Sequence, residues 1–438
     1  MAGSAALIGF LLRLSDYQTI PFRAPNPDEW NWEWSGLSQL QGMPATAWTL
    51  FWTAYPKSVW QAPPPPFTEP LVHPWVDAPP LFSWIIGSLS WLGGDRTLLD
   101  AVNDPRPRLF GIALSVLAMV LAYLLGRVAI GVRPSLVGLW LLATAPIPVV
   151  LDRLIAAEQL IAVLLLAALL AVFHLRREPH GLGWQVLLFA CCAIGPAVKA
   201  PGLVVGISAV VLLAASRQFR LAVIAAAVTV GAQAVVLGYE AATNWQSYVA
   251  EVGIRGSQLS GFTGLRFITN TTGFDGQQAF DGWWLLGWLS LAELIGRRRR
   301  DFDLLVVPCI VYLVLLLGTA AHYSSGYGWY RLVVMPLIYL LAGRFLWLAV
   351  TELSWARLAL AAALGIATAA NFAAPMHVNL SAALMGFIVL LAIAPALIAM
   401  VFQELRPLAR SGALVLLALL IPVGVLEVAN LGFIYGAH

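Results

Sequence analysis

The sequence predicts an all-α, polytopic membrane protein, and three observations support that prediction. Of the 438 residues, 60% are hydrophobic and only 11% are charged, whereas a water-soluble domain carries about 25% charged residues. Apolar stretches of about 16 to 22 residues, long enough to cross a bilayer as a helix, recur from one end of the chain to the other. This composition excludes an ordinary soluble enzyme, so the chain length is a guide to the number of helices rather than of soluble domains.

Charges, prolines and glycines divide the apolar sequence into thirteen candidate spans, give or take one or two. The apolar part of the first span ends near Leu14 and gives about 20 Å of helix, short of the roughly 30 Å hydrocarbon layer. No basic stretch precedes it and no small-residue cleavage site follows it, which disfavours a removed signal peptide. We expect the spans at about 3–21, 107–128, 134–150, 155–174, 183–197, 200–216, 219–238, 282–296, 303–320, 330–350, 356–372, 381–402 and 411–430.

The distribution of charge predicts the orientation of these spans. If the first loop is external, the alternate short loops are rich in arginine, and the positive-inside rule then places those loops in the cytoplasm. Most of the 22 acidic residues fall on the external side. The arginines of the cytoplasmic loops are Arg127, Arg133, Arg176, Arg177, Arg217, Arg220, Arg297 to Arg300, Arg357, Arg406 and Arg410.

Two long external segments interrupt the spans, at about 22–106 and 239–281, so any site with room for a substrate is expected outside. The first segment is rich in tryptophan and proline, which suits short helices at the lipid interface. We expect such helices near 44–56 and 79–93. No internal repeat of 20 to 50 residues is visible, which disfavours repeat-built transporters.

Polar residues at the external ends of the spans form five candidate groups. The first is the adjacent pair Asp28 and Glu29, whose nearest basic residue in the sequence is Arg23. Asp28 suits the N-cap of the segment that follows. It equally suits a general base, because a charged neighbour and partial burial would raise its pKa. This feature alone leaves both interpretations open.

The second group is His73 and Asp77, just before a helix that begins with Pro79 and Pro80. The third is Arg153 and Glu158, at the external start of the fourth span. An ionisable residue about one turn inside an apolar helix is a functional candidate, although an ion pair between Arg153 and Glu158 would be a structural alternative.

The fourth group is Lys199, in the Gly- and Pro-broken junction 195–202 between two apolar runs. Lys199 either snorkels to the headgroups or binds a lipid phosphate, since a broken helix exposes backbone groups that can line a cavity. The fifth group, at the external end of the tenth span, contains a second phosphate candidate, Arg331. Its other members are His322, Tyr323, Tyr327 and Tyr330. All five groups map to one face of the membrane, which favours one shared site.

Two further features are assigned structural roles. The tract Arg297 to Arg300 is typical of a topology anchor that contacts lipid headgroups. The three cysteines, Cys191, Cys192 and Cys309, lie in apolar runs without the spacing of a metal site or a disulfide framework, and are expected to pack in the interior.

In their order along the chain, these motifs resemble the GT-C glycosyltransferases of the protein O-mannosyltransferase and aminoarabinose transferase superfamily. The shared features are an Asp-Glu pair after the first span, Asp-x-Pro-Pro-Leu at 77–81, an arginine followed by an acid at the fourth span, a lysine in a broken helix, and Arg-x-x-x-x-Pro at 331–336. Residues 106–111 and 123–127 also resemble the second span of that superfamily. The resemblance implies a GT-C fold with a catalytic region over about 1–350. Residues 351–438 are expected to add membrane helices without a separate soluble domain.

The resemblance also implies roles for individual residues. Asp28 would be the catalytic base, Glu158 the second acid, and Lys199 would lie near the donor phosphate. Glu29 and Asp77 would be supporting acids. The sequence departs from the superfamily at Ala78, where a histidine or lysine is common, and at Glu158, where aspartate is common. The expected donor-binding residues are Lys199, Arg331, Asp77, His73, Arg153 and Tyr330.

The expected donor is a sugar on a lipid carrier, because the external face lacks nucleotide sugars and the sequence contains no GxxxxGK[ST] phosphate loop. The resemblance implies that this carrier is a polyprenyl phosphate. The acceptor would be a hydroxyl of a glycolipid, polysaccharide or protein, and the sugar carbon would be inverted in a single displacement. Membrane lipids are expected partners and nucleic acid is not. No cofactor is required by this chemistry, while a divalent metal near Asp28 or Asp77 is left open. The composition fits a bacterial inner membrane.

Three other functions compete with a transferase of this kind. A transporter or lipid flippase would place ionisable residues near the bilayer midplane and open to both faces. A transferase with a pyrophosphate-linked oligosaccharide donor would need more cations at its site. A membrane scaffold would leave the unpaired acids and the broken helix unexplained. The clustering of ionisable residues at one rim favours the polyprenyl-phosphate-sugar transferase.

Overall fold

The structure is a computed structural model that describes residues 1–21, 27–49, 52–63, 70–257, 266–269, 272–274, 277–295, 302–319, 328–373 and 381–432. Its α-helices are α1 (Ala2–Leu14), α2 (Pro27–Leu40), α3 (Pro80–Gly93), α4 (Leu98–Asn103), α5 (Arg108–Ala129), α6 (Val132–Thr144), α7 (Pro146–Asp152), α8 (Ala157–Leu175), α9 (Leu182–Val198), α10 (Leu203–Ala215), α11 (Phe219–Thr243), α12 (Trp245–Ser257), α13 (Arg266–Thr269), α14 (Gly282–Leu294), α15 (Asp303–Thr319), α16 (Met335–Glu352), α17 (Trp355–Ala373), α18 (Ala382–Val401) and α19 (Arg406–Ala429).

Short 3-10 helices and two small antiparallel hairpins join these helices. The strands pair as β1 with β2 and as β3 with β4. The short elements are η1 (Trp52–Ala54), η2 (Lys57–Val59), η3 (Ala200–Gly202), η5 (Gly328–Val333), η6 (Gln403–Leu405), β1 (Trp60–Gln61), β2 (Leu71–Val72), β3 (Thr272–Phe274) and β4 (Gln277–Ala279).

Every predicted span range contains a helix, which confirms the all-α membrane class. Within the described residues, six helices are long and apolar enough to cross a membrane, or up to seven if α6 and α7 form one span with a 61° bend. The bend falls at Pro146, which begins α7. Four shorter apolar helices, α1, α9, α10 and α15, also lie in predicted spans. A total of thirteen spans stays a prediction.

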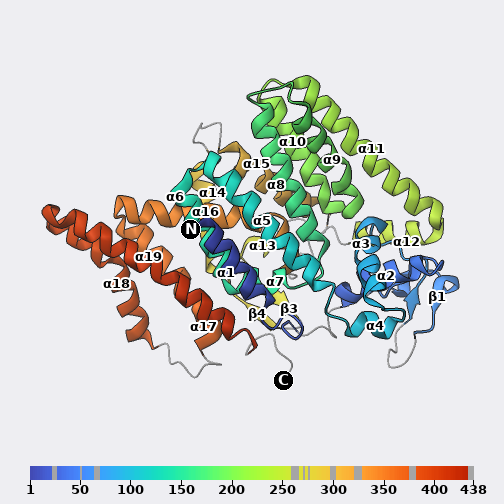
Figure 1. Cartoon of the computed structure of the whole chain (residues 1–438), viewed down its shortest axis with the longest axis horizontal. Helices are drawn as coiled ribbons and strands as arrows, with labels where there is room; N and C mark the ends of the chain where they lie inside the picture. The colour runs from blue at the N-terminus through green and yellow to red at the C-terminus, as the bar shows by residue number, and fades with distance from the viewer. Residues whose placement is uncertain are drawn as a thin grey trace.

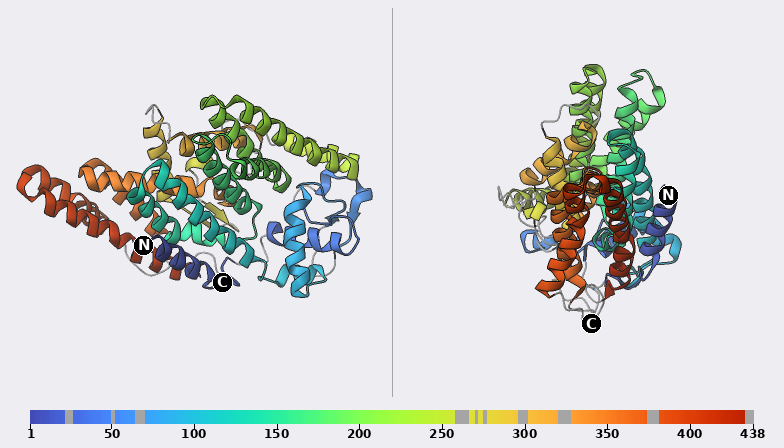
Figure 2. Two further views of the ribbon diagram at one scale, coloured as in Figure 1. Left: turned by 45° about the horizontal axis from the view of Figure 1, so that its top comes forward. Right: turned by 90° about the vertical axis from the view of Figure 1, so that its left-hand side faces the viewer.

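The helices differ in how much of their surface the protein covers. The apolar windows of α8 and α16 are each 78% buried, whereas those of α11, α18 and α19 are 28%, 17% and 22% buried. Figures 1 and 2 show why: α8 and α16 run through the body, while α18 and α19 form an arm at one end of the molecule. The arm exposes leucine, valine and phenylalanine side chains, as expected of helices that face lipid.

The segment predicted to be the first external loop folds into a small layer at the opposite end from the arm, where α2, α3, α4 and β1 lie together (Figure 1). It is called the external layer below, after that prediction. Its α2 and α3 cross at glycines. A Cβ atom on Gly36 would lie 1.9 Å from the carbonyl oxygen of Ser83, and one on Gly87 would lie 2.4 Å from the carbonyl carbon of Gly36. Trp32 of α2 packs edge-on against Trp75 and Phe82. Glycine contact and aromatic packing thus fix α2 on α3.

The predicted interfacial helix at 79–93 is confirmed as α3, but the one at 44–56 is wrong. The described part of that segment contains an isolated bridge between Ala47 and Val72 and the short η1. The side chain of Asn31 donates to the carbonyl of Trp48 at 2.9 Å and accepts from its amide at 2.9 Å. Backbone groups here bond to neighbouring segments instead of forming a helix. The helix lies earlier, at α2.

A buried ion pair fixes the first helix to the body. Arg13, with a fully buried side chain, bonds to the carboxylate of Asp152 at 2.6 and 2.9 Å. The same guanidinium donates to the carbonyls of Gly9, Leu142 and Ala143. The end of α1 is therefore attached to both α6 and α7.

Candidate functional site

Asp28 lies in the first turn of α2, directly after Pro27. Burial raises the pKa of its carboxyl group above the ordinary value, and this is the largest influence on it. The positive charge of Lys199 acts in the opposite direction, while the negative charges of Glu158 and Glu29 raise the pKa further. These influences place Asp28 close to charged residues from distant parts of the chain.

Lys199 lies where α9 ends and η3 begins, between Pro196 and Pro201. Its ammonium is 2.6 Å from Oε1 of Glu158, at the second position of α8. The side chain of Glu158 is 1% exposed and that of Lys199 is 17% exposed. The pair is thus buried on the carboxylate side and partly open on the lysine side.

Two aromatic rings enclose the same ammonium. Its nitrogen lies 4.9 Å from the ring centre of Tyr330 in η5 and 5.6 Å from that of Trp32 in α2. Asp28, Trp32, Glu158, Lys199 and Tyr330 are called the Lys199 site below. They come from α2, α8, the junction of α9 with η3, and η5, so the predicted convergence of remote segments is present for these residues.

Glu29 makes a buried ion pair. Its carboxylate accepts two hydrogen bonds from Arg108 of α5, at 2.7 and 2.8 Å, and a longer one, at 3.4 Å, from the amide of Ile155. Side-chain exposure is 0% for Arg108 and 1% for Glu29. Glu29 therefore fixes α2 against α5 and the segment just before α8, and this positions the neighbouring Asp28.

Arg153 and Arg331 contact residues outside the Lys199 site. Arg153 donates to the carbonyl of Leu12 at 2.7 Å and to the hydroxyl of Ser15 at 3.0 Å, so it holds the end of α1. The structural pair considered for Arg153 and Glu158 is replaced by the pair with Lys199. The guanidinium of Arg331 is buried and lies 5.2 Å from the ring centre of Trp284. A phosphate role for either arginine stays a prediction.

The second predicted group lies in the external layer. Asp77 accepts a hydrogen bond from the hydroxyl of Tyr55, and the backbone amide of His73 donates to the carbonyl of Val59 at 2.9 Å. Both side chains are half-buried. The predicted residues His322, Tyr323 and Tyr327 lie outside the described residues.

Among the described residues, a group of three carboxylates close enough to share a cation lies next to α4. A divalent metal near Asp28 or Asp77 stays open. Glu33, Asp95 and Asp104 each have an oxygen within 4.8 Å of those of the other two. Arg106 bonds to Asp95 at 2.8 Å and to Asp104 at 2.7 Å, which offsets part of the charge. Burial, with a hydrogen bond to Asp104, raises the pKa of Asp95 to about 6.

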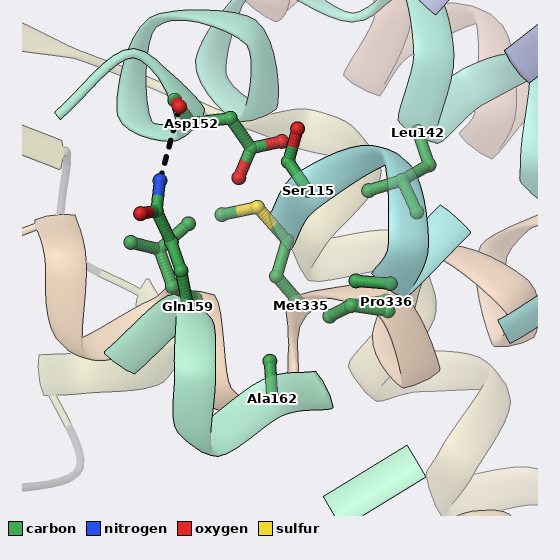
Figure 3. Close-up of a pocket in the computed structure, with 9 residues that line it drawn as sticks. Ser115, Leu142, Asp152, Gln159, Ala162, Met335 and Pro336 are labelled. Carbon is green, nitrogen blue, oxygen red and sulfur yellow. Dashed lines mark hydrogen bonds between the residues drawn. The ribbon is translucent and has the colours of Figure 1, made fainter. Parts of the chain in front are cut away.

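A small cavity lies next to α8, and the side chains of Ser115, Asp152 and Gln159 are the polar ones that line it. Gln159 donates from its amide nitrogen to the carbonyl of Asp152 at 3.0 Å, as Figure 3 shows, and Ser115 and Met335 line the same space. The cavity measures about 20 Å³, which is room for a water molecule and too little for a sugar.

Two residues were missed from the sequence: Trp32, in the Lys199 site, and Tyr312, next to it. Trp32 would have followed from a helix at 27–40, because it lies four residues after Asp28 and so on the same helix face. Tyr312 of α15 is fully buried and donates from its hydroxyl to the carbonyl of Tyr330 at 2.7 Å. A single tyrosine in an apolar span gives no signal of that contact.

Comparisons with known proteins show which proteins the chain resembles. Residues 77–239 match the sequence profile of the dolichyl-phosphate-mannose-protein mannosyltransferase family. No curated protein sequence matches the chain. Among solved structures, ArnT from Cupriavidus metallidurans bound to undecaprenyl phosphate superposes with a TM-score of 0.58 and 18% identity, over 98% of this chain and 76% of ArnT.

A second structural relative is more distant. The oligosaccharyltransferase AglB from Archaeoglobus fulgidus, in complex with an inhibitory peptide and a dolichol-phosphate, superposes with a TM-score of 0.52 and 13% identity. The alignment covers 94% of this chain, which spans only 55% of AglB. The profile match over 77–239 supports the resemblance inferred from the order of the motifs, and the superposition on ArnT shows that the chain has the GT-C fold.

Proposed function

We propose that this protein transfers a sugar from a polyprenyl-phosphate-linked donor to an acceptor hydroxyl at the external face of a bacterial inner membrane. The observation that carries the proposal is that Lys199, a partly open cation at the end of an apolar helix, lies near enough to the carboxylate of Asp28 to act on its charge. Such a pair supplies a proton acceptor and a phosphate contact side by side. The undecaprenyl phosphate in the ArnT structure supports the same class of donor.

The reaction would be a single displacement at the anomeric carbon. The acceptor oxygen forms a bond to that carbon and gives its proton to Asp28, while the bond from the carbon to the phosphate oxygen breaks. The leaving polyprenyl phosphate takes the electron pair and gains one negative charge, which Lys199 stabilises. Because a phosphate leaves without prior protonation, no strong general acid is needed, and the sugar carbon is inverted.

Glu158 fits the role of a counter-charge for Lys199. In the absence of donor, the carboxylate at 2.6 Å keeps the ammonium charged and in place. A bound phosphate would share the ammonium with Glu158, because an ammonium has three donors. Glu158 thus orients the phosphate contact and is not itself the base.

The decisive experiment is Asp28→Asn, which keeps the shape of the side chain and removes the proton acceptor. Purified protein in detergent is given a labelled polyprenyl-phosphate sugar and candidate acceptors. Transfer should fall by about a hundredfold or more while donor binding is kept. Glu178→Gln, at an exposed residue after α8, is the control and should keep normal activity. Normal turnover by Asp28→Asn would remove Asp28 from the mechanism.

The same assay separates this proposal from the competing ones. A transferase releases free polyprenyl phosphate in detergent, where a transporter or flippase has no membrane across which to move it. A retained anomeric configuration in the product would contradict the single displacement. A preference for a pyrophosphate-linked oligosaccharide over a monophosphate-linked sugar would assign the protein to the polymerase or ligase class instead.

A further inference from the structure

We infer that Tyr312, outside the Lys199 site, is a positioning residue for it: its hydroxyl fixes η5 so that the ring of Tyr330 covers the ammonium of Lys199. The catalytic consequence rests on the proposed function. The geometric consequence does not, because it can be read on Lys199 directly.

The first step concerns the hydroxyl of Tyr312. A phenol costs free energy to bury unless it finds an acceptor, so a fully buried tyrosine differs from phenylalanine by the bond that it makes. Here that bond is to the carbonyl of Tyr330, at 2.7 Å. The ring of Phe267 packs edge-on against Tyr312, with ring centres 6.0 Å apart, which helps to hold the phenol in this orientation.

The second step concerns η5, which carries Tyr330. A 3-10 helix has poorer internal hydrogen bonds than an α-helix, so contacts from outside have a large share in its position. Tyr312 contacts it at Tyr330, and the next residue, Arg331, lies with its guanidinium over Trp284. Two successive residues of η5 are therefore attached to α15 and α14.

The third step concerns the ammonium of Lys199. Glu158 occupies one side of it, and the rings of Tyr330 and Trp32 lie near two others. Trp32 is fixed by Trp75 and Phe82 within the external layer. The position of the Tyr330 ring is set by η5. Loss of the hydrogen bond from Tyr312 to η5 would therefore uncover the side of the ammonium that this ring covers. The rings favour the charged amine, exclude water and leave fewer directions in which its remaining N–H groups can meet a phosphate.

The exposure of the Lys199 amine can be measured selectively, because only two of the 25 basic residues are lysines, Lys57 and Lys199. Acylation of the purified protein with an amine reagent, followed by mass spectrometry, gives the labelling rate of Lys199 relative to that of Lys57. If the ring of Tyr330 is displaced, Lys199 becomes more accessible and its neutral form less disfavoured. Both changes raise its relative labelling rate.

The expected results separate the hydroxyl of Tyr312 from the ring of Tyr330. Tyr312→Phe should raise the relative labelling of Lys199 by about threefold or more, and Tyr330→Leu should do the same. Tyr330→Phe keeps the ring and should leave the ratio unchanged. The double variant Tyr312→Phe with Tyr330→Leu should label no faster than Tyr330→Leu alone, because both changes remove the same contact.

Tyr339→Phe is the matched control. Tyr339 is also fully buried and donates its hydroxyl to a single partner, Asp281, at 2.8 Å, but it lies on α16 outside the Lys199 site. Its loss should leave the labelling of Lys199 at the wild-type ratio. An equal rise in Tyr339→Phe and Tyr312→Phe would show general loosening of the bundle and would overturn the inference.

The kinetic expectation is a rise of about threefold in the KM for the donor in Tyr312→Phe, with little change in kcat. The inference would be overturned if Tyr312→Phe unfolds cooperatively and still labels Lys199, relative to Lys57, at the wild-type rate. If Tyr312→Phe does not fold, Tyr312→Met fills the space without a hydroxyl and is judged by the same ratio. Failure of the wild type to transfer sugar would end the proposed function and leave the labelling result standing.

Discussion

The one cation of the Lys199 site is a lysine in a chain whose other basic residues are, with the exception of Lys57, arginines. An arginine presents a flat fork of five donors, whereas lysine carries a compact point charge on a flexible stem. The compact charge can lie 2.6 Å from Glu158 and within about 6 Å of two ring centres at once. Lys199→Arg is therefore not a conservative change here.

The charge of Lys199 should set the pH at which Asp28 becomes active. A base must be deprotonated, so activity falls as the pH drops through the raised pKa of Asp28. Lys199 lowers that pKa, so Lys199→Met should move the acid limb of kcat/KM for the donor to higher pH, in addition to weakening donor binding. Glu178→Gln should leave the limb in place. A shift to lower pH would contradict the proximity of Asp28 and Lys199.

Asp95 should make stability depend on pH in the opposite sense from an ordinary ion-paired carboxylate. Its folded-state pKa of about 6 lies above the ordinary 3.8. The folded protein thus binds a proton more tightly, and this contribution to stability is full below about pH 4 and is lost as the pH rises through 6.

Asp95→Asn keeps an acceptor for Arg106 and does not titrate. Between pH 4 and 7 the wild type should lose more unfolding free energy than Asp95→Asn, by about 2 kcal/mol. Unfolding of both proteins in detergent at several pH values measures the difference. Parallel stability curves for the two would show that Asp95 is ionised in the folded protein throughout this range.

The residues of the site were predictable from the sequence, and their partners were not. Charged residues stand out in a chain with 11% charge, so Asp28, Glu158 and Lys199 could be selected by their position at span ends. The partner of Glu158 is Lys199, 41 residues away, rather than Arg153, five residues away. Which pair forms depends on the packing of α8 against α9, and no local pattern encodes that.

The element α1 is held by the buried ion pair of Arg13 with Asp152, in addition to the hydrogen bonds that Arg153 makes to its end. Arg13→Met would leave the buried carboxylate of Asp152 without a counter-charge, which costs about 3–5 kcal/mol in comparable pairs. We expect a large loss of thermal stability in Arg13→Met, and a smaller one in the double variant Arg13→Met with Asp152→Asn, where the uncompensated charge is gone. Thermal unfolding of the single and double variants measures this. A double variant that is the sum of two large single losses would contradict the pairing.

The placement of α2 on α3 depends on Gly36. A methyl group there would lie 1.9 Å from the backbone of Ser83, so Gly36→Ala must push the two helices apart. Because Asp28 and Trp32 lie on α2, we expect transfer activity to fall by about tenfold or more, as small misplacements of catalytic groups cost up to a hundredfold.

The control for this change is Gly183→Ala in α9, where an added methyl group meets nothing within 4 Å. It should leave activity unchanged and slightly favour the helix. Assays of both variants, with their melting temperatures, separate misplacement from unfolding. Normal activity in Gly36→Ala would show that the position of α2 does not control the chemistry.

Helices could be predicted well from the sequence where apolar runs are long, and less well in the external layer. α3 was found because two prolines begin it and an apolar pattern follows. α2 has a mixed composition of acids, tryptophans and serines, and its helical state depends on tertiary partners such as Arg108 and the β-bridge segment near Trp48. Those partners lie 17 and 79 residues away from their α2 contacts, beyond the reach of local pattern.

The two ends of α8 carry different groups of charged residues. Glu158 begins this helix and Leu175 ends it, about 28 Å away for 19 residues at 1.5 Å each. Beyond Leu175 come Arg176 and Arg177, while the Lys199 site lies at the other end. If the arginine end is cytoplasmic, the Lys199 site opens to the outside of the cell.

Cysteine labelling can test that orientation directly, because the three native cysteines are all buried. Gln61, in β1 of the external layer, and His180, in the loop between α8 and α9, are both exposed. In intact cells, an impermeant maleimide should label Gln61→Cys and leave His180→Cys unlabelled, and permeabilised cells should show both. The wild type controls for the native thiols. Labelling of His180→Cys alone in intact cells would show that the protein has the opposite orientation, with the Lys199 site in the cytoplasm. A nucleotide sugar would then be the simpler donor.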